Sequence, residues 1–165
     1  MPKILIFGNS GSGKSTLSKQ LAEKFALSYL DLDRLAWQKT KPTVRQPVDE
    51  SHAQIIRFMR ANPNWVIEGC YADLLEMFID SASEIIFLNP GVKTCLNNCR
   101  SRPWEPHKYA SLDEQNKNLQ MLLEWVEQYP LRNDEFSLNS HQALFDRFLG
   151  KKTELTSNAR NELSV

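Results

Sequence analysis

The sequence lacks several features that would assign it to a specialised class of protein. No run of about 18 apolar residues occurs, so we expect no membrane span. Basic and acidic residues number 20 each among the 165 residues, so the net charge is zero. A neutral chain has no broad attraction to nucleic acid or to an anionic membrane. No repeat or low-complexity tract is visible, and the length is that of a single domain over residues 1–165.

Cysteines are few and form no familiar metal-binding pattern. The three are Cys70, Cys95 and Cys99, an odd number in a chain whose first residues do not resemble a signal peptide. This usage indicates reduced thiols, and we expect a cytoplasmic protein. Cys95 and Cys99 lie one helical turn apart, and neither has a histidine at the spacing of zinc ligands. We predict that all three are packing residues.

One dense motif is present. Residues 8–15 match the phosphate-binding pattern G-x-x-x-x-G-K-[ST] at every fixed position. Residues 3–7, just before it, form an apolar run of buried-strand type, and residues 14–26, just after it, have the spacing of an amphipathic helix. A strand, a glycine loop and a helix in that order are the context that the motif requires, which argues against a chance glycine-rich turn.

The chemistry of this loop follows from its backbone. Its N–H groups are expected to converge on a bound phosphate, assisted by the positive end of the helix dipole. Lys14 would reach the β- and γ-phosphates of ATP, and the Ser15 hydroxyl would ligate Mg²⁺. The predicted nucleotide-binding residues are Gly8, Asn9, Ser10, Gly11, Ser12, Gly13, Lys14, Ser15 and Thr16.

Strand and helix patterns alternate along the chain, which predicts an α/β fold with a parallel sheet between two layers of helices. The predicted strands are 3–7, 27–32, 65–68, 84–88 and 152–156. The predicted helices are 14–26, 47–60, a short one after Gly69, 92–100, 112–129 and 136–149. Residues 37–47 are predicted to form a loop, and residues 101–111 a mobile loop.

Polar side chains follow several predicted strands. Because ligands bind beyond the carboxyl ends of parallel strands, these side chains are expected along one rim with the glycine loop. They are Asp31, Asp33, Glu68 and Asn89.

Asp31 and Asp33 alternate at the end of a predicted strand, so both carboxylates are expected to share one face. One would hold Mg²⁺ through water, and the other would orient or deprotonate an acceptor molecule. We assign Asp33 to catalysis and metal binding, and both aspartates to the acceptor. Glu68, followed by Gly69, is predicted to face the acceptor pocket. The alternatives are a solvated strand end that caps the next helix, and a turn residue at Glu68.

Basic residues gather in the predicted mobile loop and beyond the helix that follows. They are Arg100, Arg102, His107, Lys108 and Arg132. Phosphoryl transfer requires cations around the equatorial oxygens, and a closing loop would deliver them while excluding water. We predict that Arg100 and Arg132 are catalytic, with surface charge as the alternative for each. Trp37 is predicted to stack on a ring of the acceptor, and packing is its alternative role.

With these residues in place, the chain resembles the P-loop kinases of the adenylate kinase and shikimate kinase type. More closely it resembles the bacterial family often labelled DNA topology modulation protein, or FlaR-like. The segments that carry the resemblance are the 8–15 loop, Leu32-Asp33 with Leu35 and Trp37, Trp65–Gly69 with Tyr71, Ile85–Leu88, the arginines near 100, and Tyr129-Pro130 with Arg132.

The resemblance implies a three-layer P-loop NTPase sandwich whose five-stranded parallel sheet has the order 2-3-1-4-5. It also implies an ATP and Mg²⁺ site, a small acceptor site and a lid near residues 100–112. Two positions depart from the family. Asn89 stands where an aspartate is usual after the fourth strand, which weakens any metal role there. Glu68 replaces the more usual aspartate and has a longer reach.

Two functions are compatible with these patterns. The first is an enzyme, an ATP-dependent kinase that moves the γ-phosphoryl group to a nucleoside monophosphate or to a small hydroxyl metabolite. A phosphate acceptor needs no base, whereas a hydroxyl acceptor is helped by one, so the role of Asp33 depends on the acceptor. The second is a regulatory nucleotide-binding protein of the DNA topology modulation type, with weak or no kinase activity. The neutral charge argues against binding of nucleic acid. A protein that only retains a vestigial loop would not require lysine at position 14.

Overall fold

A computed structural model describes residues 1–41 and 43–159. The predicted α/β architecture is confirmed: one five-stranded sheet has the order β2-β3-β1-β4-β5, and all its neighbouring pairs are parallel. The strands are β1 (Lys3–Gly8), β2 (Ser28–Asp31), β3 (Trp65–Gly69), β4 (Glu84–Leu88) and β5 (Lys151–Leu155). Each lies within two residues of its predicted range. This is the sheet of a P-loop NTPase kinase fold.

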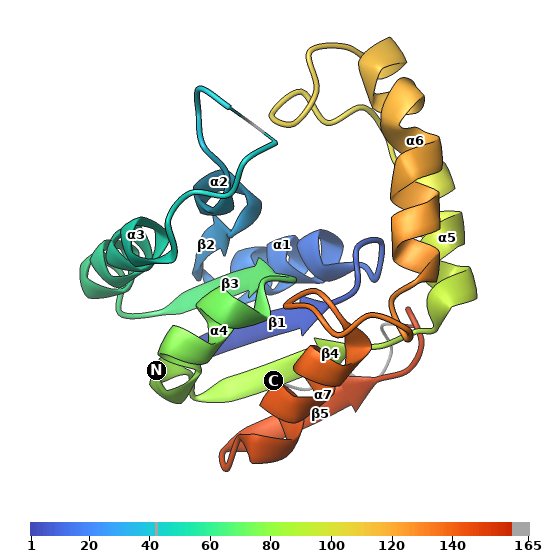
Figure 1. Ribbon diagram of the computed structural model, residues 1–165. Coiled ribbons are helices and arrows are strands. Elements are labelled where there is room, and N and C mark those ends of the chain that lie inside the picture. Colours follow the sequence, from blue (N-terminus) through green and yellow to red (C-terminus); the bar gives the residue numbers. More distant parts are fainter. Residues whose placement is uncertain (42, 160–165) are drawn as a thin grey trace.

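The helices are α1 (Lys14–Phe25), α2 (Asp33–Ala36), α3 (Val48–Ala61), α4 (Ala72–Phe78), a 3₁₀ turn η1 (Ile79–Ser81), α5 (Val92–Arg100), α6 (Leu112–Glu127) and α7 (Leu138–Arg147). Helix α1 covers one face of the sheet, and α3, α4 and α7 cover the other (Figure 1). Both core layers begin from β1, where Ile4 and Ile6 pack toward α1 while Leu5 and Phe7 pack toward the opposite layer.

Strand register brings polar residues together at one edge of the sheet. Glu68 of β3 pairs with Ile6 of β1 on one side and with Asp31 of β2 on the other. The glycine loop leaves the same edge directly after β1. The register therefore places Asp31 and Glu68 next to each other and beside the loop.

The short helix α2 was not predicted, and its presence corrects the prediction that residues 27–32 are all strand and that Asp33 belongs to the same strand end. Strand β2 ends at Asp31, and the Leu32 amide still bonds to the Glu68 carbonyl at 2.9 Å. The chain then turns, and the Leu35 amide bonds to the Leu32 carbonyl at 3.0 Å. Asp33 is thus the first residue of a helix. The sequence did not predict this helix, because a single turn is too short to show a helical period.

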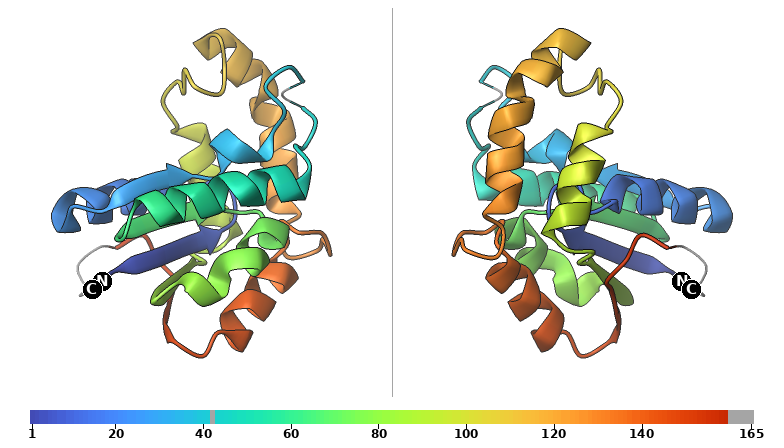
Figure 2. Two further views of the ribbon diagram at one scale, coloured as in Figure 1. Left: turned by 90° about the vertical axis from the view of Figure 1, so that its left-hand side faces the viewer. Right: turned by 90° about the vertical axis from the view of Figure 1, so that its right-hand side faces the viewer.

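Helices α5 and α6 pack against each other and extend beyond the carboxyl edge of the sheet (Figures 1 and 2). Their contact is built on Cys95, Cys99 and Val126, so these two cysteines are packing residues as predicted. Residues 101–111 connect the two helices and bend back toward α2 (Figure 1). We call residues 101–111 the lid segment.

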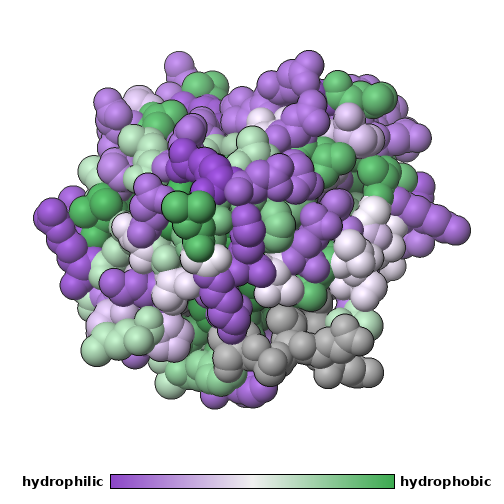
Figure 3. All heavy atoms as spheres, turned by 90° about the horizontal axis from the view of Figure 1, so that it is seen from below, coloured by the Kyte–Doolittle hydropathy of each residue, from purple (hydrophilic) through white to green (hydrophobic). Residues whose placement is uncertain are grey.

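Apolar and hydrophilic side chains are interspersed over the face of the molecule shown in Figure 3. Within residues 1–41 and 43–159, none of the helices combines the length and the hydrophobicity needed to cross a bilayer.

Candidate nucleotide and acceptor site

Glycines shape the phosphate loop where a side chain would not fit. Gly11 has φ +77°, and a Cβ there would lie 2.5 Å from the Cys95 carbonyl oxygen and 2.6 Å from the Cys99 sulfur. Gly13 has φ +98° and directly precedes α1. Both backbone conformations belong to the left-handed region that favours glycine. The loop therefore lies against α5 in a shape that the spacing of its glycines alone does not reveal.

The loop is also braced by distant polar side chains. The Asn98 side chain donates to the Gly11 carbonyl at 2.8 Å, and Asn158 donates to the Ser12 carbonyl at 3.0 Å. Asn98 also donates to Asn158 at 2.9 Å, so the two braces support each other. Local sequence carries no signal for these residues, because they lie about 87 and 146 positions away in the chain. Their bonds occupy the carbonyls of Gly11 and Ser12, while the Ser12 amide bonds to the Asn9 carbonyl at 3.1 Å inside the loop.

Helix α1 begins without a side-chain cap, so the N–H groups of its first turn remain available to an anion. Lys14, in that turn, donates from Nζ to the Asn9 carbonyl at 2.8 Å and is half-buried. An ammonium group held at the mouth of the loop is suited to phosphate oxygens, which would replace the single carbonyl bond.

Glu68 contacts the phosphate loop directly. Its Oε1 atom accepts hydrogen bonds from the Ser15 hydroxyl at 2.8 Å and from the Tyr29 hydroxyl at 2.9 Å. Glu68 is only 3% exposed. Burial, with the nearby charge of Asp31 acting in the same direction, raises its pKa to about 7. Sequence reasoning assigned Glu68 to the acceptor, whereas its contacts join it to the residue expected to bind Mg²⁺.

Asp31 and Asp33 meet by a different route from the predicted one. The Asp33 amide donates to Asp31 Oδ1 at 2.9 Å, so Asp31 caps the start of α2 while it stays buried. Burial raises the pKa of the Asp31 carboxyl, and the charge of Asp33 adds to the rise. Burial alone would also raise the pKa of Asp33, but the charge and hydrogen bond of Lys108, together with the Tyr71 hydrogen bond and the charge of Lys14, lower it. The pKa values of the two carboxyls are therefore shifted in opposite directions.

Tyr71 holds Asp33 from the core side. Its hydroxyl donates to Asp33 Oδ1 and accepts a bond from the Trp37 indole nitrogen at 2.8 Å. Tyr71 is only 2% exposed, and its ring packs edge-on against Trp37 and Phe136, with centroids 6.3 and 5.4 Å away. Sequence reasoning did not assign a role to Tyr71, although it lies in one of the segments that carry the family resemblance. Trp37 lines the same wall, and its stacking on an acceptor stays a prediction.

The predicted catalytic arginines are engaged within the α5–α6 region. Arg100 is exposed at the end of α5 and donates to the Asn97 side chain at 3.3 Å. Arg132 stacks on the Trp125 ring at 4.1 Å and pairs with Asp134 at 3.2 Å. The observed contacts thus join Ser15 to Glu68 and Asp31 to Asp33, and strand register places Asp31 beside Glu68. The two arginines contact none of these residues.

A family model described as an AAA domain matches residues 4–121, which is most of the chain. The protein belongs to this AAA domain family. A gluconokinase from Sinorhizobium meliloti 1021 has a similar structure with a TM-score of 0.52, 18% identity, and coverage of 96% of this chain and 83% of that chain. The likeness confirms the P-loop kinase fold of the adenylate and shikimate kinase type.

Two shikimate kinases align with lower TM-scores. The one from Bacteroides thetaiotaomicron has a TM-score of 0.47 at 18% identity, covering 88% of this chain and 97% of that chain. The one from Acinetobacter baumannii, in complex with shikimate, has a TM-score of 0.46 at 17% identity, covering 87% and 89%. No curated protein sequence matches the chain.

The donor set of this AAA domain protein fits a magnesium ion. Ser15 supplies a hydroxyl oxygen, and Glu68 and Asp31 supply carboxylate oxygens at adjacent strand ends. Mg²⁺ prefers such oxygen ligands and is usually held by one or two carboxylates together with substrate phosphates. In the described residues, no cluster of three or more His, Cys, Asp or Glu side chains forms a metal site of its own.

Proposed function

We propose that the protein is an ATP-dependent kinase that transfers the γ-phosphoryl group to a hydroxyl group of a small molecule. One observation carries this proposal: Asp33, fixed by the buried Tyr71 hydroxyl, lies at the same sheet edge as the phosphate loop. A hydroxyl acceptor is helped by a carboxylate that accepts its proton, whereas a nucleoside monophosphate is already nucleophilic. The gluconokinase of similar fold is a small-molecule kinase by its name, which supports the same class.

The nucleotide half of the site has clear roles for its residues. The loop amides and Lys14 would bind the phosphates of ATP, and Ser15 would hold Mg²⁺ with Asp31 and Glu68 in its outer shell. When bound, Mg²⁺ neutralises charge on the β- and γ-phosphate oxygens. We assign Glu68 to the nucleotide half and not to the acceptor, because its carboxylate accepts a hydrogen bond from the Ser15 hydroxyl.

The acceptor half depends on Asp33. Its carboxylate would accept the proton of the acceptor hydroxyl as that oxygen attacks phosphorus. Trp37 lines this half of the site. Arg100 and Arg132 remain proposed charge-neutralising residues, and each would have to leave its present partner to reach a phosphate. The narrower resemblance to the DNA topology modulation family stays a prediction.

A substrate screen tests the proposal. Purified protein with Mg-ATP is offered sugar acids, polyols, cyclic hydroxy acids and nucleoside monophosphates, and acceptor-dependent ADP release is measured. We expect stimulation by a hydroxyl compound, and Asp33→Asn should then lower kcat about 10²- to 10⁴-fold. Asp80→Asn is the matched control, because Asp80 is exposed in η1 at the opposite edge of the sheet. Stimulation by nucleoside monophosphates alone, or full activity of Asp33→Asn, would contradict the proposal.

A further inference from the structure

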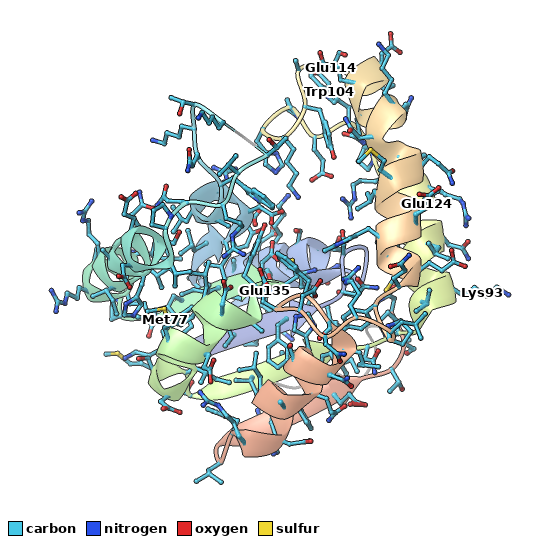
Figure 4. All side chains as sticks on the ribbon, in the orientation of Figure 1. Met77, Lys93, Trp104, Glu114, Glu124 and Glu135 are labelled. Carbon is cyan, nitrogen blue, oxygen red and sulfur yellow. The ribbon has the colours of Figure 1, made fainter. Side chains whose placement is uncertain are left out.

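The lid segment is a folded unit that is fixed to α6. The Gln115 side chain is buried at the start of α6. It accepts a hydrogen bond from the Glu105 amide at 2.8 Å and donates one to the Pro103 carbonyl at 3.0 Å. The Trp104 indole nitrogen donates to the Tyr109 carbonyl at 3.0 Å and closes the turn. Trp104 itself lies at the end of the α5–α6 pair that is farthest from the sheet (Figure 4). The segment therefore presents its inner residues at a defined position.

Two basic residues of this turn reach Asp33 of the acceptor half and the neighbouring Asp31. Lys108 Nζ lies 2.5 Å from Asp33 Oδ2, and His107 Nε2 lies 3.9 Å from Asp31 Oδ2. Glu105 balances them from the same turn, 3.3 Å from Lys108 and 3.8 Å from His107. The contact thus joins residues about 75 positions apart (108 against 33) and ties the lid segment to the sheet edge.

The two oxygens of Asp33 have partners of different kinds. Oδ1 is bonded to Tyr71, whose buried ring cannot leave without disturbing the core. Oδ2 is bonded to Lys108, whose side chain is 25% exposed and comes from the lid segment. Burial alone would lower the pKa of Lys108, but the charge and hydrogen bond of Asp33, together with the charges of Glu105 and Asp31, raise it, so the ammonium form is favoured. The oxygen available to an acceptor is therefore the one that Lys108 occupies.

We propose that Lys108 is a placeholder for the acceptor hydroxyl on Asp33. The acceptor hydroxyl would take the position of the Lys108 ammonium at Oδ2, and the lid segment would be released from Asp33 as the acceptor binds. The identity of the occupant as an acceptor rests on the proposed kinase function. Without acceptor, the protein would keep its base covered, and Asp33 would not present a free carboxylate to water beside a bound nucleotide.

Hydrogen–deuterium exchange of the whole protein without ligands tests the contact. In Lys108→Met, the amides of residues 104–109 should exchange about fivefold faster than in the unchanged protein, as expected for loss of a partly buried ion pair. Lys117→Met, on the exposed face of α6, is the matched control and should not change the exchange. Asp33→Asn should accelerate exchange to a similar extent, and the double variant should add little. Unchanged exchange in Lys108→Met, or additive effects in the double variant, would overturn the proposal.

Kinetics with the acceptor found in the screen separate this proposal from the proposed function. Lys108→Met should lower KM for the acceptor several-fold and leave KM for ATP unchanged, because a competitor for Oδ2 is removed. A raised KM for the acceptor would mean that Lys108 binds the acceptor. In a protein with kinase activity, this result would overturn the placeholder role of Lys108. Faster exchange in Lys108→Met with no acceptor in the whole panel would instead overturn the kinase function and the placeholder role, while the ion pair itself would be supported.

Discussion

The two halves of the site differ in how the chain builds them. The proposed nucleotide half is built mainly on a contiguous loop at residues 8–15, and its main proposed ligands are backbone amides and one lysine. The proposed acceptor half is assembled from β2, α2, Tyr71 just beyond β3 and the lid segment, and its proposed ligands are side chains. Backbone ligands follow from local conformation, whereas side-chain ligands follow from packing. Substitutions in the nucleotide half should therefore have local effects, whereas substitutions in the acceptor half should affect several elements.

Among the substitutions that follow, the largest effect on kcat is expected in the nucleotide half. Lys14→Ala should lower kcat about 10²- to 10³-fold, because the ammonium stabilises charge on the transferred phosphoryl group. The free energy of unfolding should change by less than about 1 kcal/mol, since Lys14 makes one hydrogen bond to a loop carbonyl. ADP release and thermal unfolding measure the two quantities. Turnover close to that of the unchanged protein would refute the assigned role of Lys14.

The free energy of unfolding should depend on pH through His141, which lies behind the acceptor half. His141 is fully buried, and its Nε2 lies 2.8 Å from the Cys70 carbonyl, next to Tyr71. Burial lowers the pKa of His141 to about 4 from its ordinary value of 6.5. Below pH 6.5 the unfolded chain binds a proton that the folded protein excludes, so stability is present at neutral pH and falls as pH decreases toward 4. The loss should approach about 3 kcal/mol.

Chemical denaturation at several pH values measures this dependence. His141→Gln retains a donor and an acceptor but does not titrate, so its stability should lack this contribution and fall less between pH 7 and pH 4, as expected for a group without linkage (about 3 kcal/mol at most). Equal pH slopes in both proteins would show that His141 is not the titrating group.

Gly11→Ala tests whether the shape of the phosphate loop depends on the close approach of Gly11 to α5. The φ of +77° and the contact with the Cys95 carbonyl should together cost about 2 kcal/mol of unfolding free energy and weaken ATP binding. Gly91→Ala is the control, because Gly91 has φ +97° with open space around it and so reports the backbone strain alone. Equal destabilisation by the two substitutions would remove any contribution from the contact with α5.

Tyr71→Phe should have the smallest effect and separate positioning from packing. The ring is retained, and only the hydroxyl that orients Asp33 is lost, so kcat should fall about tenfold while KM for ATP stays unchanged. Tyr129→Phe removes another buried hydroxyl, which lies 2.6 Å from His141 Nδ1, and should leave kcat near its normal value. A similar kcat in both variants would assign Tyr71 a structural role only.

Much of the fold was predictable because its signals are local and repeated. Apolar runs and turn residues placed all five strands, and the order 2-3-1-4-5 that the family resemblance implied is the observed one. Helix α2 was missed because one turn has no period to detect. Asp31 and Asp33 were expected to lie together because they would share one face of a strand. They are instead joined by a hydrogen bond from the Asp33 amide to the Asp31 carboxylate at the start of α2.

The partners of the candidate site were less predictable. Lys108 appeared only as one basic residue among several, and its contact with Asp33 requires the lid segment between α5 and α6 to bend back toward α2 (Figure 1). Glu68 was expected to face the acceptor, but Ser15 and Tyr29 both donate to it. Such choices depend on which neighbours desolvate and bond a side chain, and these neighbours come from distant parts of the chain.

By itself, the sequence determined the phosphate loop, the parallel sheet and the edge at which ligands bind, because glycine spacing and hydrophobic periodicity act over a few residues. Only the tertiary structure decided which carboxylate faces the phosphate loop, which oxygen of Asp33 is free of the core, and that a lysine from the lid segment occupies it. These outcomes depend on the burial and charge of groups that meet only after the chain has folded.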